Sequence, residues 1–69
     1  MQISARNTLK GTVKAVKLGE VNAEIVLDLG NGLELTSIIT RTAAERLELE
    51  VGKPAYALIK SSDVIVGVD

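Results

Sequence analysis

The sequence predicts an all-β domain of five short strands, with one short helix between the third and fourth strands. Two observations carry this prediction. Apolar and polar residues alternate along most of the chain, and a period of two is typical of half-buried strands rather than of helices. Turns that contain glycine separate these alternating segments. At 69 residues the chain has the length of one domain.

The first three strands are expected at residues 9–17, 22–29 and 33–40. The first strand ends at a Leu-Gly-Glu turn, residues 18–20. The second and third strands are joined by Gly30-Asn31-Gly32, whose residues tolerate a positive φ. Because both flanking segments alternate and the connection is tight, these two strands are predicted to form a hairpin.

A short helix is expected directly after the third strand. Thr42 and Glu45 have the spacing of a capping box, in which the threonine hydroxyl accepts from the glutamate N–H and the glutamate side chain reaches back. The helix should last only one or two turns and end near residue 47 or 48. A turn is predicted at residues 51–54, which include Gly52 and Pro54.

Two apolar strands complete the predicted domain, at residues 55–60 and 64–68, with the polar turn Ser61-Ser62-Asp63 between them. Three strands, a short helix and two further strands follow the order of an OB-type barrel. The predicted fold class is therefore all-β, a small five-stranded OB-like barrel in which residues 1–69 form a single domain.

The composition excludes most catalytic chemistry. The chain has no histidine and no cysteine, so it can build neither a Ser/His/Asp nor a Cys/His arrangement, and it lacks the usual ligands of a structural zinc ion. The carboxylates are placed as ordinary solvated residues on strands, turns and the short helix. We therefore expect no enzymatic activity, no cofactor and no direct protein–metal ligands.

Length and apolar content favour an oligomer. A chain of this size buries only about 60% of the surface that its unfolded form exposes, and no disulfide can reinforce the fold. Yet 46% of the residues are apolar. Self-association is the remaining common device for stabilising so small a domain. We expect part of the apolar surface to be shared between subunits.

Charge and aromatic content argue against nucleic acid and membrane partners. The formal net charge is −1 with both signs interspersed, and Tyr56 is the only aromatic residue. Met1 is followed by a polar, alternating segment rather than a signal peptide, and no apolar run approaches the roughly 18 residues of a membrane span. Cytoplasmic localisation is the default expectation.

Two short segments gather hydrogen-bond donors. Ser4, Arg6 and Asn7 place a hydroxyl, a guanidinium and a carboxamide just before the first strand. Near the other end, the run Lys60-Ser61-Ser62 offers an ammonium and two hydroxyls. Donors with fixed positive charge and no titratable base suit the binding of an oxyanion. Each segment alone is equally well explained by solvent exposure, as a strand start or as a polar turn.

In combination these segments are specific. The chain contains Ile3-Ser4-Ala5-Arg6-Asn7, then Leu9-Lys10-Gly11, then Thr36-Ser37-Ile38-Ile39-Thr40, then Lys60-Ser61-Ser62-Asp63-Val64. Over essentially its whole length it closely resembles the molbindins, small free-standing molybdate-binding proteins of prokaryotes in the Mop/TOBE-like family. A similar module is appended to molybdate-responsive transcription factors and molybdate transporter ATPases. One departure is Thr8, where the family usually has glutamine.

The resemblance implies an OB-like fold, a hexamer built as a trimer of dimers, and sites for molybdate or tungstate between subunits. Matched by position, the interfacial site comprises side-chain donors and main-chain groups of Ser4, Ala5, Arg6, Thr40, Lys60, Ser61 and Ser62. Arg6 acts there either through its side chain or through its backbone N–H. A second site is implied at the turn after the first strand: Gly19, Glu20, Val21 and Asn22. The implied function is intracellular storage and homeostasis of the oxyanion.

Two alternatives stay open at this stage. The strand order alone also fits an OB-type oligonucleotide-binding module, although the charge and the single aromatic residue argue against it. An interaction module whose oligomer holds a partner fits as well. Molybdate and tungstate are nearly isosteric dianions, so the sequence does not separate them. The sequence also does not show whether the site excludes sulfate, which depends on the size of the cavity. It leaves open whether the protein stores the oxyanion or delivers it.

Overall fold

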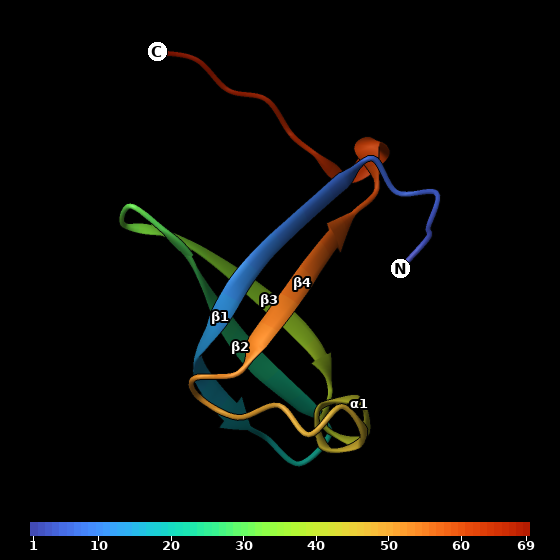
Figure 1. Cartoon of the computed structure of the whole chain (residues 1–69), viewed down its shortest axis with the longest axis vertical. Coiled ribbons are helices and arrows are strands. Elements are labelled where there is room, and N and C mark those ends of the chain that lie inside the picture. Colours follow the sequence, from blue (N-terminus) through green and yellow to red (C-terminus); the bar gives the residue numbers. More distant parts are fainter.

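The computed structural model describes all of residues 1–69. It contains one antiparallel sheet in the order β3-β2-β1-β4, and no helix in it is long and apolar enough to cross a membrane. The elements are β1 (Asn7–Leu18), β2 (Asn22–Gly30), β3 (Leu33–Thr40), α1 (Arg41–Arg46), β4 (Pro54–Ile59) and a single 3₁₀ turn η1 (Ser61–Asp63). The sheet is curled, with α1 at one end and η1 near the N-terminal segment at the other (Figure 1).

Two irregularities in the strand pairing help to explain the curl. Between β1 and β2 the pairing steps from Val13↔Leu27 to Ala15↔Val26, which leaves Lys14 as an extra residue on β1. A similar step occurs between β2 and β3 near their turn. An extra residue on one strand bends that strand and increases the local twist. The sheet therefore forms a half-barrel rather than a flat layer.

The predicted hairpin is confirmed. β2 and β3 pair along their length and are joined by a turn in which Gly30, Asn31 and Gly32 have φ values of 94°, 54° and 78°. The Asp28 carboxylate accepts a hydrogen bond of 2.8 Å from the Gly30 N–H and closes the turn. Residues that tolerate a positive φ are thus located where the backbone requires it.

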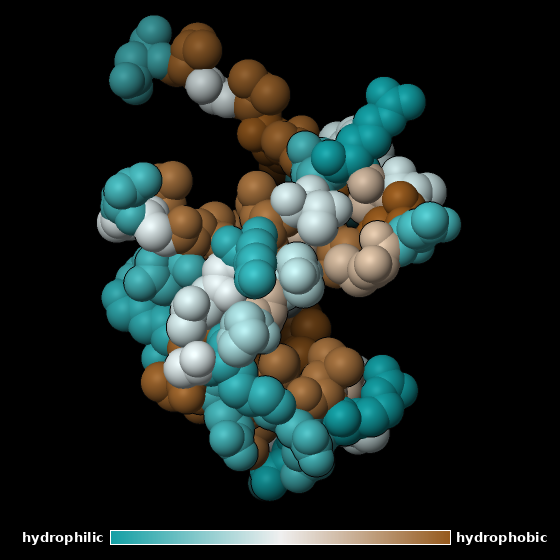
Figure 2. Space-filling view, in the orientation of Figure 1, coloured by the Kyte–Doolittle hydropathy of each residue, from teal (hydrophilic) through white to brown (hydrophobic).

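The fully buried core is small. Its five members lie on β1, β2 and α1 and are Val13, Ala23, Ile25, Leu27 and Ala44. Partly buried side chains from β3, β4 and the loop after α1 pack around this cluster. Many apolar residues stay at the surface, where they form brown areas between the polar ones (Figure 2). The concave side of the half-barrel is therefore only partly covered within one chain.

The prediction of a fifth strand at residues 64–68 is wrong for the single chain, which has four strands. The Ser61–Asp63 segment makes one 3₁₀ turn instead of a hairpin turn, with bonds from the Asp63 N–H to the Lys60 carbonyl (2.9 Å) and from the Val64 N–H to the Ser61 carbonyl (3.3 Å). After this turn the chain leaves the sheet (Figure 1). The all-β, OB-like fold class holds.

The predicted capping box at Thr42 and Glu45 is also wrong. The helix begins two residues earlier than that box requires, and its N-cap is Thr40, whose hydroxyl accepts a 3.0 Å hydrogen bond from the Ala43 N–H. Thr40 has extended dihedral angles, as an N-cap residue needs, since it is also the last residue of β3. Thr42 lies inside the first helical turn.

Candidate functional site

The structure brings the two predicted donor segments together. Asn7, the first residue of β1, pairs with Ile59, the last residue of β4, and the Asn7 side-chain amide also donates to the Ile59 carbonyl at 3.3 Å. Residues 4–6 and 60–62 therefore leave the sheet side by side at the same end, as Figure 1 shows for the N-terminal segment and η1. Segments more than fifty residues apart in sequence are thereby neighbours.

The donors at this end are free to bind a ligand. Ser4, Arg6 and the run Lys60-Ser61-Ser62 are exposed, and their side chains make no hydrogen bond or ion pair within the chain. Ala5, which lies between Ser4 and Arg6, is half-buried. One carboxylate, that of Asp63, follows on the same turn. The two positive charges of Arg6 and Lys60 outnumber the one negative charge of Asp63, so this end of the sheet has an excess of positively charged donors.

Thr40 lies elsewhere in the chain. It pairs with Asn22 at the start of β2, and the next residue of β2, Ala23, pairs with Leu18 at the end of β1. Thr40 therefore lies near the end of the 12-residue strand β1, whereas Asn7 lies at its start. Its hydroxyl oxygen accepts from the helix, which leaves the hydroxyl proton free to donate outward. Within a single chain Thr40 does not join the other members of the predicted interfacial site.

The predicted second site, Gly19–Asn22, lies next to Thr40. Its turn is closed by a bond of 2.7 Å from the Gly19 N–H to the Asn22 carbonyl. The backbone N–H of Arg41 donates to the Val21 carbonyl at 2.8 Å, and the Arg41 guanidinium donates to the Gly19 carbonyl at 3.3 Å. The exposed carboxylate of Glu20 can only accept hydrogen bonds, so any anion here would depend on other donors.

Arg41 was missed by the sequence reasoning. Its guanidinium donates a hydrogen bond to the Gly19 carbonyl of the Gly19–Asn22 turn, and its Nε lies 3.6 Å from a carboxylate oxygen of Glu45, one helical turn on. The available signal was a basic residue directly after Thr40, at the junction of strand and helix. Its contact with the turn comes from the pairing of β2 with β3, which sequence spacing alone does not reveal.

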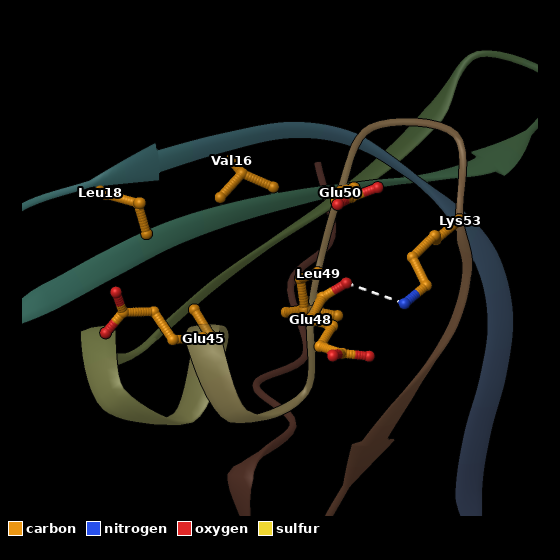
Figure 3. Close-up of a pocket in the computed structure, with 8 residues that line it drawn as sticks. Val16, Leu18, Glu45, Glu48, Leu49, Glu50 and Lys53 are labelled. Atoms are coloured by element: carbon orange, nitrogen blue, oxygen red, sulfur yellow. Dashed lines mark hydrogen bonds between the residues drawn. The ribbon is translucent and has the colours of Figure 1, made fainter.

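The surface hollows of the chain do not contain the donors at the Lys60 end. The hollow in Figure 3, of about 430 Å³, is lined by Glu45, Glu48 and Glu50, and the Lys53 ammonium that faces it donates to the Glu48 carbonyl at 2.8 Å. Three carboxylates and one engaged ammonium disfavour an anion. A larger hollow of about 580 Å³ is apolar, and a third, of about 360 Å³, lies around Gly11.

One titratable group outside these segments is shifted. The hydrogen bond to the Glu34 carboxylate, together with its negative charge, raises the pKa of the Lys14 ammonium above its ordinary value. Both side chains lie on the outer surface of the sheet and are about half exposed. The pair joins β1 to β3 across β2 and has no part in the donor cluster.

Comparison with known proteins gives the family. Residues 3–66, nearly the whole chain, match the TOBE domain. The chain belongs to the TOBE domain family. This confirms the resemblance to Mop/TOBE-like proteins that the donor segments predicted. A probable molybdenum-pterin-binding protein of Haemophilus influenzae is 51% identical over 69 residues, which is all of both chains. Molybdenum-pterin-binding protein 3 of Clostridium pasteurianum is 50% identical over 66 residues, 96% of this chain and 97% of that protein.

Solved structures of similar sequence share the fold. MopII from Clostridium pasteurianum superposes with a TM-score of 0.91 at 43% identity, covering 97% of this chain and 100% of its own. The cytoplasmic molybdate-binding protein ModG, solved with molybdate bound, gives a TM-score of 0.95 at 49% identity. This chain is covered completely in that comparison and spans about half, 49%, of the ModG chain. The OB-like all-β architecture is therefore shared with molybdate-binding proteins.

Proposed function

We propose that this TOBE domain protein binds molybdate, or the nearly isosteric tungstate, at sites between copies of the chain, and that it stores and buffers the oxyanion in the cytoplasm. One observation carries the proposal: the free donors of residues 4–6 and 60–62 are held side by side by the pairing of Asn7 with Ile59. The binding of molybdate by a structural relative of 49% identity supports the choice of ligand.

The chemistry of molybdate matches the donors. Molybdate is a tetrahedral dianion whose outer atoms are all oxygen, so a protein binds it with hydrogen-bond donors and not with metal ligands. Lys60 and Arg6 supply charge, and the hydroxyls of Ser4 and Ser61 rotate to donate. Charge-assisted bonds contribute on the order of 1.5–3 kcal/mol each, so a few of them suffice for micromolar affinity, which corresponds to about 8 kcal/mol.

The position of Thr40 supports a site between subunits. Because Thr40 lies at the other end of β1, it contributes to the same oxyanion only from a second copy whose α1 end packs against the Lys60 end of the first. Backbone groups near Ala5 and Ser62 complete the donor set. A hexamer, arranged as a trimer of dimers, provides such contacts repeatedly. The ligand then stabilises the assembly, because it binds the assembled form in preference to free chains.

Two further assignments belong to this proposal. The Gly19–Asn22 turn, with Arg41 beside it, is a second anion site formed at the α1 end of the sheet. The whole chain, residues 1–69, acts as one binding module without catalysis, since its donors hold an oxyanion but offer no nucleophile with a paired base.

Calorimetric titration of the purified protein with sodium molybdate tests the proposal. We expect saturable heat at micromolar protein, and competition by tungstate at similar concentration. Sulfate, a smaller tetrahedral dianion, serves as the matched control and should compete weakly if the cavity between copies fits the larger ion. Absence of saturable heat with both molybdate and tungstate would refute the proposed function.

A further inference from the structure

The turn between β1 and β2, residues 19–22, is held by Arg41 at two points. The Arg41 backbone N–H donates to the Val21 carbonyl at 2.8 Å, and the guanidinium donates to the Gly19 carbonyl at 3.3 Å. No backbone N–H donates to the Gly19 carbonyl, so the guanidinium is its partner within the chain. The Asn22 carbonyl accepts from the Gly19 N–H at 2.7 Å. Three carbonyl groups of the turn are therefore already engaged by donors of the protein.

Two N–H groups of the same turn stay free. Glu20 and Val21 lie between the strands, are exposed, and donate no hydrogen bond from their backbone within the chain. A backbone N–H without a protein partner is satisfied by water or by a ligand. Successive backbone N–H groups in a turn are a common setting for a bound anion. Because its carbonyls are engaged and these N–H groups are not, the turn presents mainly donors.

The charge at this turn depends on Arg41. Glu20 carries a negative charge on the turn itself, and a carboxylate oxygen of Glu45 lies 3.6 Å from the Arg41 Nε. Arg41 is the only cation that donates a hydrogen bond to the turn. Without it, two carboxylates would repel an anion there. The Arg41 and Glu45 side chains are 42% and 59% exposed, so water weakens their ion pair and the remaining guanidinium N–H groups stay accessible.

We propose that Arg41 is the residue that makes the Gly19–Asn22 turn an anion site, and that Glu45 limits the affinity of this site. Arg41 holds the turn with its N–H groups free and supplies the positive charge. A tetrahedral oxyanion then accepts from the N–H groups of Glu20 and Val21 and from the guanidinium together. Glu45 opposes binding because its carboxylate competes with the ligand for the same guanidinium. The inference rests on the proposed function for the identity of the ligand, molybdate.

Amide NMR of isotopically labelled protein, titrated with sodium molybdate, follows each site through its own N–H groups. Glu20 and Val21 report on the turn, whereas Ala5 and Ser62 report on the donor segments at the Lys60 end. We expect the signals of both groups to shift in the natural protein. Glu20 and Val21 should reach half-saturation at a higher molybdate concentration, because the turn combines one cation with two nearby carboxylates.

Two variants that each remove one charge should have opposite effects at the turn. Arg41→Gln should weaken binding about tenfold, the lower end of the range for a charge-assisted hydrogen bond, because the side chain is 42% exposed. Arg41→Lys should recover part of the affinity, since it keeps the charge. Glu45→Gln should strengthen binding about two- to fivefold, because it removes the competing carboxylate.

Arg46→Gln is the matched control. Arg46 lies on the same helix, is exposed, and makes no hydrogen bond or ion pair, and its loss changes the net charge as much as Arg41→Gln does. We expect its half-saturation at the turn to stay within about twofold of the natural protein. A normal response of Ala5 and Ser62 in Arg41→Gln shows that this variant is folded. If Arg41→Gln does not fold, the direction of the Glu45→Gln effect still decides.

The possible failures are distinguishable. If no amide signal shifts, the proposed function fails and the inference fails with it. If Ala5 and Ser62 respond but Glu20 and Val21 do not, molybdate binding stands and the site at the turn is refuted. Equal half-saturation at the turn in Arg41→Gln and Arg46→Gln would refute the role of Arg41. Weaker or unchanged binding at the turn in Glu45→Gln would refute the competition, because a merely structural partner of Arg41 gives no gain in affinity when it is removed.

Discussion

Replacing Lys60 by alanine should weaken molybdate binding by about 10- to 150-fold. The Lys60 ammonium is exposed and has no partner in its own chain, so the substitution removes a ligand contact without removing an internal one. A charge-assisted hydrogen bond is worth on the order of 1.5–3 kcal/mol, and each 1.4 kcal/mol is about a factor of ten in affinity. The thermal stability of the ligand-free protein should change little, since surface substitutions usually cost less than about 0.5 kcal/mol.

Titration calorimetry on Lys60→Ala and on a matched variant, Lys10→Ala, measures this effect. Lys10 lies on β1, with its ammonium 5.9 Å from the centre of the Tyr56 ring, and its loss changes the net charge equally. We expect Lys10→Ala to retain an affinity within about threefold of the natural protein, because only the long-range field changes and salt screens it. Natural affinity in Lys60→Ala, or an equal loss in both variants, would refute the assignment of Lys60 as a direct ligand.

Substitutions at three further positions give sharp outcomes. Gly11→Ala should lower the unfolding free energy by about 1–3 kcal/mol, because an added Cβ would lie 2.7 Å from the Asp28 carbonyl oxygen; thermal melting checks this. Leu27→Ala should cost about 2–5 kcal/mol in denaturant unfolding, since this side chain is only 4% exposed in a core of five residues. Thr40→Val should lose about 1 kcal/mol of stability with the N-cap and also weaken molybdate binding, whereas Thr40→Ser should keep both. Equal behaviour of the two Thr40 variants would contradict both roles.

Local patterns were sufficient to predict most of the sheet. The alternation in β2 and β3 and the Gly30-Asn31-Gly32 turn predicted the hairpin, since these features act between neighbours in sequence. The helix was predicted in the right place, but its cap was assigned to Thr42. Only Thr42 has a glutamate three residues later, but either threonine hydroxyl could cap the helix, and the extended backbone of Thr40 decides between them. That backbone conformation is set by the pairing of Thr40 with Asn22.

The fifth strand could not be decided from the sequence of one chain. Residues 64–68 have the composition of a strand, but a strand forms only where a partner edge is within reach. Within the single chain η1 turns them away from the open edges of β3 and β4. The composition of these residues is typical of a strand, but the single chain pairs them with no edge of the sheet.

The sequence predicted the donor residues, and the family resemblance predicted that they share one site, but residue types alone do not place them in space. Residue types predicted the chemistry of Ser4, Arg6 and Lys60, and the pairing of β1 with β4 unites their two segments. The pairings of β1 with β2 and of β2 with β3 place Thr40 at the other end of β1. The β2–β3 pairing also brings Arg41 to the Gly19–Asn22 turn. The sequence pattern therefore did not determine which distant strands pair, and this pairing decides which donors are neighbours.

The most direct test of the central claim is a crystal of the protein grown with molybdate and measured at the molybdenum absorption edge, where the anomalous signal locates the metal. We predict a peak between Lys60 and Ser61 of one copy and Thr40 of another copy. A peak bound by donors of a single copy, or one remote from Lys60 in every copy, would contradict the account of a site completed by assembly.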